Sequence, residues 1–175
     1  MQLTGFLNNM QIWLKRRCLQ LKAQLILFFM ATILSNSALA NPTCTVAATG
    51  ANAIYDPLGA INTFGVGNIL VDCLYVGLGS ASPAYQIQLS AGASNTYNNR
   101  TMRYLANSLV YNLYTNASHS LVWGNGTGGT SVVADSYTMS AGTVARNYPV
   151  YMRIPGAQAI NAGTYSDSIT ITVIY

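Results

Sequence analysis

Alternation of apolar and polar residues over short runs is the feature that most constrains the fold of this chain. In residues 85–89, Tyr85, Ile87 and Leu89 share one face of an extended segment, and glutamines occupy the other face. A period of two is typical of half-buried β-strands, and no part of residues 41–175 keeps a helical period over three turns. The sequence therefore predicts an all-β domain.

Turn-forming residues separate the alternating runs. Clusters of Gly, Asn, Ser and Pro lie at residues 80–83, 91–95, 124–129 and 161–163. Short strands at this spacing indicate an antiparallel sandwich of two sheets. Residues 50–67 fit either a loop or an irregular strand. The eight predicted strands cover residues 44–48, 68–74, 85–89, 101–105, 109–114, 136–140, 148–154 and 167–175.

The first 40 residues have the pattern of a signal peptide. A basic stretch that ends at Lys22 precedes an apolar run over residues 25–34, and Ala38-Leu39-Ala40 matches a cleavage site. The alternative is an N-terminal membrane anchor, but the run is shorter than the roughly 20 residues that span a bilayer. Met10 is an alternative start. We therefore expect a signal peptide over 1–40 and a single secreted domain over 41–175, without permanent membrane insertion.

Charge changes sharply when residues 1–40 are set aside. Residues 41–175 hold four Arg and four Asp, with no Lys and no Glu, so the net charge of +4 belongs to the signal. A neutral domain predicts no nucleic-acid partner. A surface of Ser, Thr, Asn, Gly and Tyr suits a particle that packs against its own copies, and compositional drift is the alternative explanation.

Cys44 and Cys73 form an even pair once Cys18 leaves with the signal. In an oxidising compartment such a pair predicts a disulfide. Closing a loop of this length stabilises a chain by roughly 3.5 kcal/mol in the chain-entropy model.

Catalytic and metal-binding residue types are scarce in residues 41–175. The single histidine, His119, and four Asp residues show no ligand spacing, and no G-x-S-x-G turn positions a serine nucleophile. His119 lies in a polar run and is expected to be a solvated loop residue. We therefore expect no enzymatic activity, no metal and no cofactor.

Twelve tyrosines and an apolar last strand remain to be placed. Inward positions are occupied by Tyr85, Tyr111 and Tyr165. Tyr55 and Tyr97 lie in predicted loops. They either contact a receptor or another surface, or they are ordinary half-buried residues. In the last strand, four residues share an apolar face: Ile169, Ile171, Val173 and Tyr175. If this strand lies at the edge of a sheet, its unpaired backbone groups would promote aggregation unless a partner strand or another segment covers them. The alternative is that the strand lies inside a sheet.

The order of short motifs resembles that of the spore coat protein U domain family, which includes pilins of archaic chaperone–usher pili. The resemblance covers essentially all of residues 41–175, and each motif alone is weak. The motifs are Cys44-Thr45-Val46, Val71-Asp72-Cys73, Arg100-Thr101-Met102, the run 109–114, Trp123-Gly124-Asn125-Gly126, Ile154-Pro155-Gly156-Ala157-Gln158 and the run 163–173.

This resemblance implies an incomplete immunoglobulin-like sandwich that is completed by a donor strand. It implies three kinds of partner: a periplasmic chaperone, an outer-membrane usher and neighbouring pilin subunits. The donor-strand groove would be lined by Ile169, Ile171, Val173 and Tyr175. Only residues 41–43 precede Cys44 after cleavage, so we expect a subunit that receives a strand without giving one, as at a fibre tip.

Two further function classes stay open at this point. A self-complete secreted module that binds carbohydrate or protein is the main alternative to a structural or adhesive subunit of a pilus or coat. An enzyme that depends on His119 is the other. A C-terminal strand flanked on both sides by the chain's own strands would favour the self-complete module.

Overall fold

The computed structural model describes residues 41–175, so the predicted signal peptide lies outside the described residues. This part of the chain contains eight strands and one short 3₁₀ helix, η1 (Gly92–Ser94). The strands are β1 (Thr43–Thr49), β2 (Thr63–Ala81), β3 (Ala84–Leu89), β4 (Arg100–Tyr104), β5 (Asn107–Tyr114), β6 (Val133–Ser136), β7 (Met139–Ile154) and β8 (Ile171–Ile174).

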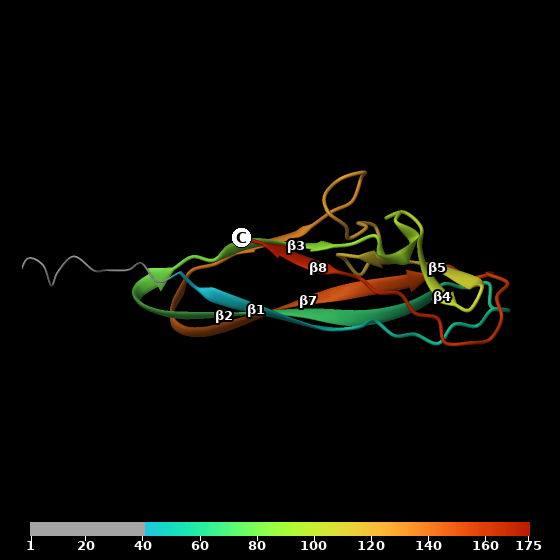
Figure 1. Cartoon of the computed structure of the whole chain (residues 1–175), viewed down its shortest axis with the longest axis horizontal. Coiled ribbons are helices and arrows are strands. Elements are labelled where there is room, and N and C mark those ends of the chain that lie inside the picture. The colour runs from blue at the N-terminus through green and yellow to red at the C-terminus, as the bar shows by residue number, and fades with distance from the viewer. Residues whose placement is uncertain (1–40) are drawn as a thin grey trace, which may run out of the picture. The chain divides into compact units, whose positions relative to one another are not determined.

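The strands form two antiparallel sheets that face each other (Figure 1). One sheet has the order β1-β2-β7-β5-β4, and the other has the order β6-β3-β8. Their inner faces are lined by alternate residues, as the period of two predicts: Tyr85, Ile87 and Leu89 are all at most 3% exposed. Trp123 lies between the sheets and donates its indole N–H to the carbonyl of Ile87. The prediction of an antiparallel sandwich is confirmed.

β2 and β7 are much longer than the sequence pattern indicated. They have 19 and 16 residues and pair along most of that length. Gly65 and Gly67 hide the start of β2, because their inward positions carry no side chain to continue the alternation. A Cβ at Gly67 would lie 2.6 Å from the carbonyl oxygen of Thr49, so the chain that leaves β1 passes directly over this part of the sheet. Residues 50–62 are a loop, and the strand begins at Thr63.

Two other predicted boundaries are wrong. The predicted strand 136–140 spans the break between β6 and β7, where Tyr137 donates its backbone N–H to the carbonyl of Pro83. The predicted strand 167–175 is shorter in the structure, since ladder pairing in β8 begins only at Ile171.

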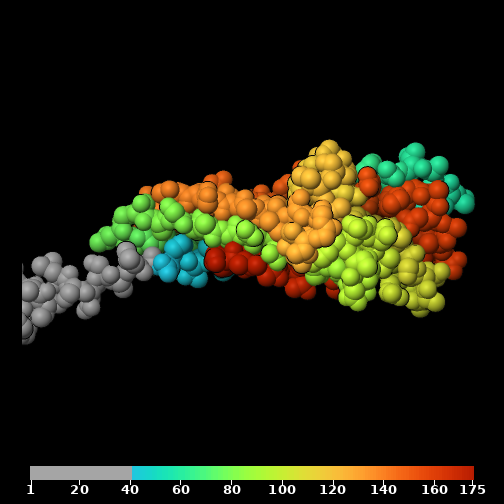
Figure 2. Space-filling model, turned by 90° about the horizontal axis from the view of Figure 1, so that it is seen from above, coloured from blue at the N-terminus to red at the C-terminus, as the bar shows by residue number. Residues whose placement is uncertain are grey.

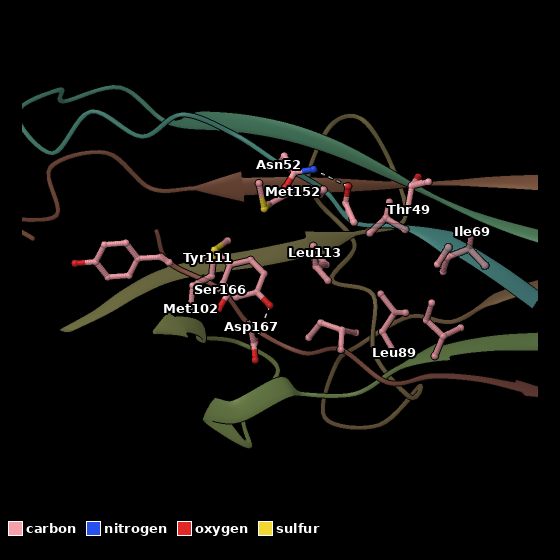
Figure 3. Close-up of a pocket in the computed structure, with 17 residues that line it drawn as sticks. Thr49, Asn52, Ile69, Leu89, Met102, Tyr111, Leu113, Met152, Ser166 and Asp167 are labelled. Atoms are coloured by element: carbon pink, nitrogen blue, oxygen red, sulfur yellow. Dashed lines mark hydrogen bonds between the residues drawn. The ribbon is translucent and has the colours of Figure 1, made fainter. Parts of the chain in front are cut away.

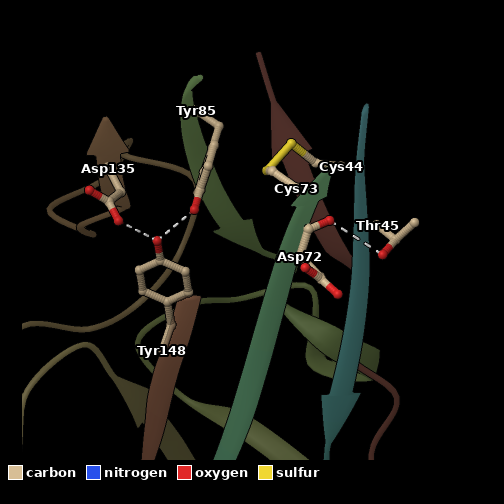
Figure 4. The surroundings of a disulfide bond; sticks show 7 residues. All are labelled: Cys44, Thr45, Asp72, Cys73, Tyr85, Asp135 and Tyr148. Carbon is tan, nitrogen blue, oxygen red and sulfur yellow. Dashed lines mark hydrogen bonds between the residues drawn. A yellow bond between two sulfur atoms is a disulfide. The ribbon is translucent and has the colours of Figure 1, made fainter. Parts of the chain in front are cut away.

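A disulfide fastens β1 to the sandwich (Figure 4). Cys44 and Cys73 are directly opposite each other in the β1–β2 pair, and their sulfur atoms are 2.02 Å apart. Cys73 is fully buried. Because β1 pairs only with β2, this bond holds an edge strand that would otherwise depend on a single ladder.

Candidate functional site

β1 and β8 are edge strands of opposite sheets, and the outer edge of each is unpaired among residues 41–175. β1 pairs only with β2, and β8 pairs only with β3. Figure 2 shows the red C-terminal segment beside the cyan residues of β1. The C-terminal strand is therefore flanked on one side only by the described strands.

A groove of about 400 Å³ lies between the end of β1 and the segment before β8 (Figure 3). One wall is residues 48–52, and the other wall is residues 165–167 with Ile169 and Ile171. Its floor is apolar and comes from both sheets: Ile69, Leu89, Met102, Leu113, Val150 and Met152. Val46 is opposite fully buried Val71 and on the inward face of β1, yet it is 42% exposed. The inward side of this edge strand thus lacks a cover in the described part of the chain.

Two of the four predicted groove residues line the groove in the structure, and the other two do not. Ile169 and Ile171 line the groove, and Val173 lies half-buried on the same face against the core. Tyr175 lies outside the groove and is 67% exposed. Its ring packs edge-on near that of Tyr85, with ring centroids 6.1 Å apart.

The same residues that face the groove also turn their backbone groups to the free edge. Thr170 uses its N–H and its C=O internally, because both bond to Ser90. In an antiparallel ladder, a residue directs both groups to one side and its neighbours direct theirs to the other side. Ile169, Ile171 and Val173 therefore present donors and acceptors along the outer edge. The side chains of Ile169 and Ile171 point into the groove, and that of Val173 packs against the core.

A buried arginine organises the wall next to the groove. Arg100 is fully buried, and within residues 41–175 the acceptors of its guanidinium hydrogen bonds are neutral oxygens. It donates to the carbonyls of Ser90 and Trp123 at 2.7 Å each and to Oδ1 of Asn112 at 2.8 Å. Burial lowers the pKa of Arg100, and the nearby Tyr111, Tyr97 and Asp167 act in the opposite direction.

Tyr111 and Asp167 form a second polar contact beside this arginine. The hydroxyl of Tyr111 donates to Oδ2 of Asp167 at 2.7 Å. Burial, then the hydrogen bond to this carboxylate, raises the pKa of the Tyr111 hydroxyl well above its usual value. Sequence reasoning missed both contacts. The sequence did contain one indication that Arg100 is buried: the period of two in β4 puts Arg100 on the same inward face as Met102.

The loop tyrosines and the histidine have internal contacts. Tyr55 is half-buried, and its hydroxyl accepts a hydrogen bond from the backbone N–H of Gln158 at 2.7 Å. Tyr97 is half-buried with its ring 5.3 Å from the Arg100 guanidinium carbon. Surface contact by these two residues stays a prediction. His119 lies in a loop and is partly exposed, and its ring also lies near the rings of Phe64, Tyr114 and Tyr151. Burial, with Arg153 nearby, lowers the pKa of His119.

Two features are absent from residues 41–175. In this range, no three His, Cys, Asp or Glu side chains are grouped as a metal site would require. The described range also has no helix that is long and apolar enough to cross a membrane.

Comparisons with known proteins identify one matching family and several structures. The family model for the Spore Coat Protein U domain matches residues 30–172. No curated protein matches the chain. Among solved structures, a chaperone–tip adhesion subunit pre-assembly complex from archaic chaperone–usher Csu pili of Acinetobacter baumannii is similar, with 22% identity and a TM-score of 0.51. That match covers 77% of this chain and 40% of the other, so the chain spans less than half the length of its structural neighbour. A chaperone–tip adhesin complex of CFA/I fimbriae matches at 14% identity and a TM-score of 0.36, covering 76% of this chain and 42% of the other.

Proposed function

Since the chain belongs to the Spore Coat Protein U domain family, we propose that it is a non-enzymatic subunit of a secreted fibre or coat. In this proposal a partner completes the sandwich by placing one of its own strands in the groove between β1 and β8. The partner's backbone would pair with the free edges, and its alternate apolar side chains would contact the groove floor.

The observation that carries the proposal is the coincidence of two unpaired edges with an exposed apolar interior. Edge strands are ordinarily protected by charges, bulges or a covering segment. Here, Ile169, Ile171 and Val173 combine free backbone groups with apolar side chains, and the described domain has no Lys or Glu at any position. A self-complete binding module would have no reason to leave this interior open.

The partners follow from the same physics. An open apolar groove is an aggregation hazard during export, so a periplasmic chaperone would cover it first. An outer-membrane usher and a neighbouring subunit would then act in sequence, and the product would lie on the cell surface. The solved complex of a chaperone with a pilus subunit of similar fold supports this order of partners.

The test is periplasmic expression of the full chain with and without its cognate chaperone. We expect soluble, protease-resistant protein only when the chaperone is present, and a stable complex of the two proteins on gel filtration. A second arm supplies a synthetic peptide with alternating apolar residues in place of the chaperone. Stable monomer with neither addition would contradict the proposal.

An adhesive role is a second candidate, and exposed apolar residues at one end of the sandwich favour it. In the loop after β1, Ile54, Leu58 and Ile61 are 96%, 94% and 82% exposed. Leu105, in the β4–β5 turn at the same end (Figure 1), is 83% exposed. The loop is held in place, because the backbone N–H of Ala157 donates to the carbonyl of Gly59 at 2.8 Å. A fixed apolar end of this kind suits contact with an apolar surface.

Replacing Ile54, Leu58 and Ile61 together by serine is expected to reduce retention of the protein on polystyrene beads by roughly a hundredfold or more. Three exposed side chains of this size bring several kcal/mol of apolar contact on a flat surface, while their loss changes the free energy of unfolding by only about 0.5 kcal/mol each. A matched control replaces Val76 and Leu78, which are 77% and 100% exposed near the disulfide end of β2. Equal loss in both variants would exclude a specific adhesive end.

A further inference from the structure

Residues 167–170 come just before β8 and continue its alternation of half-buried and exposed residues, but they are not part of the β3–β8 ladder. Asp167 and Ile169 are half-buried, whereas Ser168 and Thr170 are exposed, which is the alternation of a strand. Ladder pairing nevertheless starts at Ile171, opposite Leu89. The residues before Ile171 are held by side-chain hydrogen bonds and by isolated backbone contacts at Ser166 and Thr170.

Arg100 is the reason that the ladder ends at Ile171. The next pair in register would be Ser90 with Thr170, and the backbone N–H of Ser90 does donate to the carbonyl of Thr170 at 2.9 Å. The carbonyl of Ser90 is occupied, because it accepts from Nε and Nη2 of Arg100 at 3.1 and 2.7 Å. The hydroxyl oxygen of Ser90, instead of its carbonyl oxygen, therefore accepts the hydrogen bond from the backbone N–H of Thr170 at 2.9 Å.

Asp167 fixes the start of this segment from the other side. Its carboxylate accepts from the Tyr111 hydroxyl at 2.7 Å and from the backbone N–H of Ala93 at 3.0 Å. Gly92 permits this approach, since a Cβ there would lie 2.1 Å from Oδ2 of Asp167. Ser166 exchanges two backbone hydrogen bonds with Arg103 of β4, at 2.8 and 3.1 Å. The segment is thus tied to β4, β5 and η1 before it reaches β3.

We propose that these contacts extend the strand-accepting edge of β8 back to Asp167, and that the partner segment pairs along residues 167–174 rather than 171–174. Ser166 and Thr170 use their backbone groups internally, so the intervening odd-numbered residues face outward. Among residues 41–175, no hydrogen bond uses the backbone N–H or C=O of Ile169. The contacts hold these groups in line with those of Ile171 and Val173 before any partner binds. This inference rests on the proposed function.

The experiment adds a partner strand to the chain itself. An alternating valine–threonine strand is fused after Tyr175 through a flexible linker, in a long form that reaches Asp167 and a short form that stops at Ile171. We expect both forms to slow hydrogen exchange of the Val173 amide. Only the long form is expected to slow exchange of the Ile169 amide, by about tenfold for one hydrogen bond formed in a partly buried site.

Tyr111→Phe is expected to abolish the protection of Ile169 in the long form while the protection of Val173 remains. Asp167→Asn is the second variant in case Tyr111→Phe does not fold. Tyr148→Phe is the matched control, because it removes a comparable hydroxyl bond to Asp135 away from the groove and leaves Ile169 protected (Figure 4). If neither form protects Val173, the groove takes no strand and the proposed function fails. If Val173 is protected but Ile169 is not, or if Tyr111→Phe changes nothing, only the extension is overturned.

Discussion

The Ile171→Asp variant is expected to lose binding of any partner strand, the strand of the chaperone included. In the free domain Ile171 is half-buried at the groove, so a carboxylate there keeps access to water. A bound strand would seal it against the apolar side chains of Leu89 and Leu113. Moving a carboxylate into such an environment costs about 4 kcal/mol, which is roughly a thousandfold in the dissociation constant.

The measurement is the amount of chaperone complex recovered from the periplasm, at pH 7, when the chaperone is co-expressed with the parent or with the variant. Ile174→Asp is the control, because Ile174 is on the same strand, points outward and is 48% exposed. We expect this control to bind within about twofold of the parent, as surface substitutions usually do. Normal binding by Ile171→Asp would mean that no partner side chain or backbone covers this position.

Arg100→Met is expected to destabilise the domain by roughly 3–6 kcal/mol, since about three buried acceptors each lose their donor. These acceptors are the carbonyls of Ser90 and Trp123 and the side-chain oxygen of Asn112. Removing the buried charge recovers some desolvation energy, but the orphaned acceptors remain away from water. A loss of this size is a large part of the ~5–15 kcal/mol by which a domain is stable.

Urea unfolding of the long form, in which the partner strand is fused after Tyr175, measures this effect together with the yield of that protein. Arg103→Met is the control: Arg103 is three residues further along β4, and its side chain is exposed. Its bonds to Ser166 are made by the backbone and survive the substitution. A midpoint for Arg100→Met equal to that of the control would show that the buried guanidinium adds nothing to stability.

The alternating runs carried most of the information about the fold. Tyr85, Ile87 and Leu89 were recognisable as an inward face because each apolar side chain is followed by a polar one, and all three are buried. The start of β2 was not recognisable, because glycines stand at its inward positions. These glycines leave room for Thr49, at the end of β1, and for Asn52, in the loop that follows β1.

In the candidate site, too, the sequence indicated which side chains share a face but not which distant residues they contact. Period two placed Ile169, Ile171 and Val173 on one face, and the structure has that face toward the core and groove. The role of Arg100 was out of reach, because its acceptors come from residues 10, 12 and 23 positions away. The aromatic contacts of the loop residue His119 were out of reach for the same reason, because its polar neighbours in sequence say nothing about the rings that other strands bring to it.

The sequence by itself determined where most strands lie, which faces they bury and which two cysteines are available for a disulfide, because these follow from residue type and local spacing. Only the tertiary structure decided which strands are left at the edges, where the groove lies and why β8 begins at Ile171. Those features depend on contacts between residues distant in the chain, such as Arg100 with Ser90 and Tyr111 with Asp167. No local periodicity encodes which carbonyl a buried guanidinium will occupy.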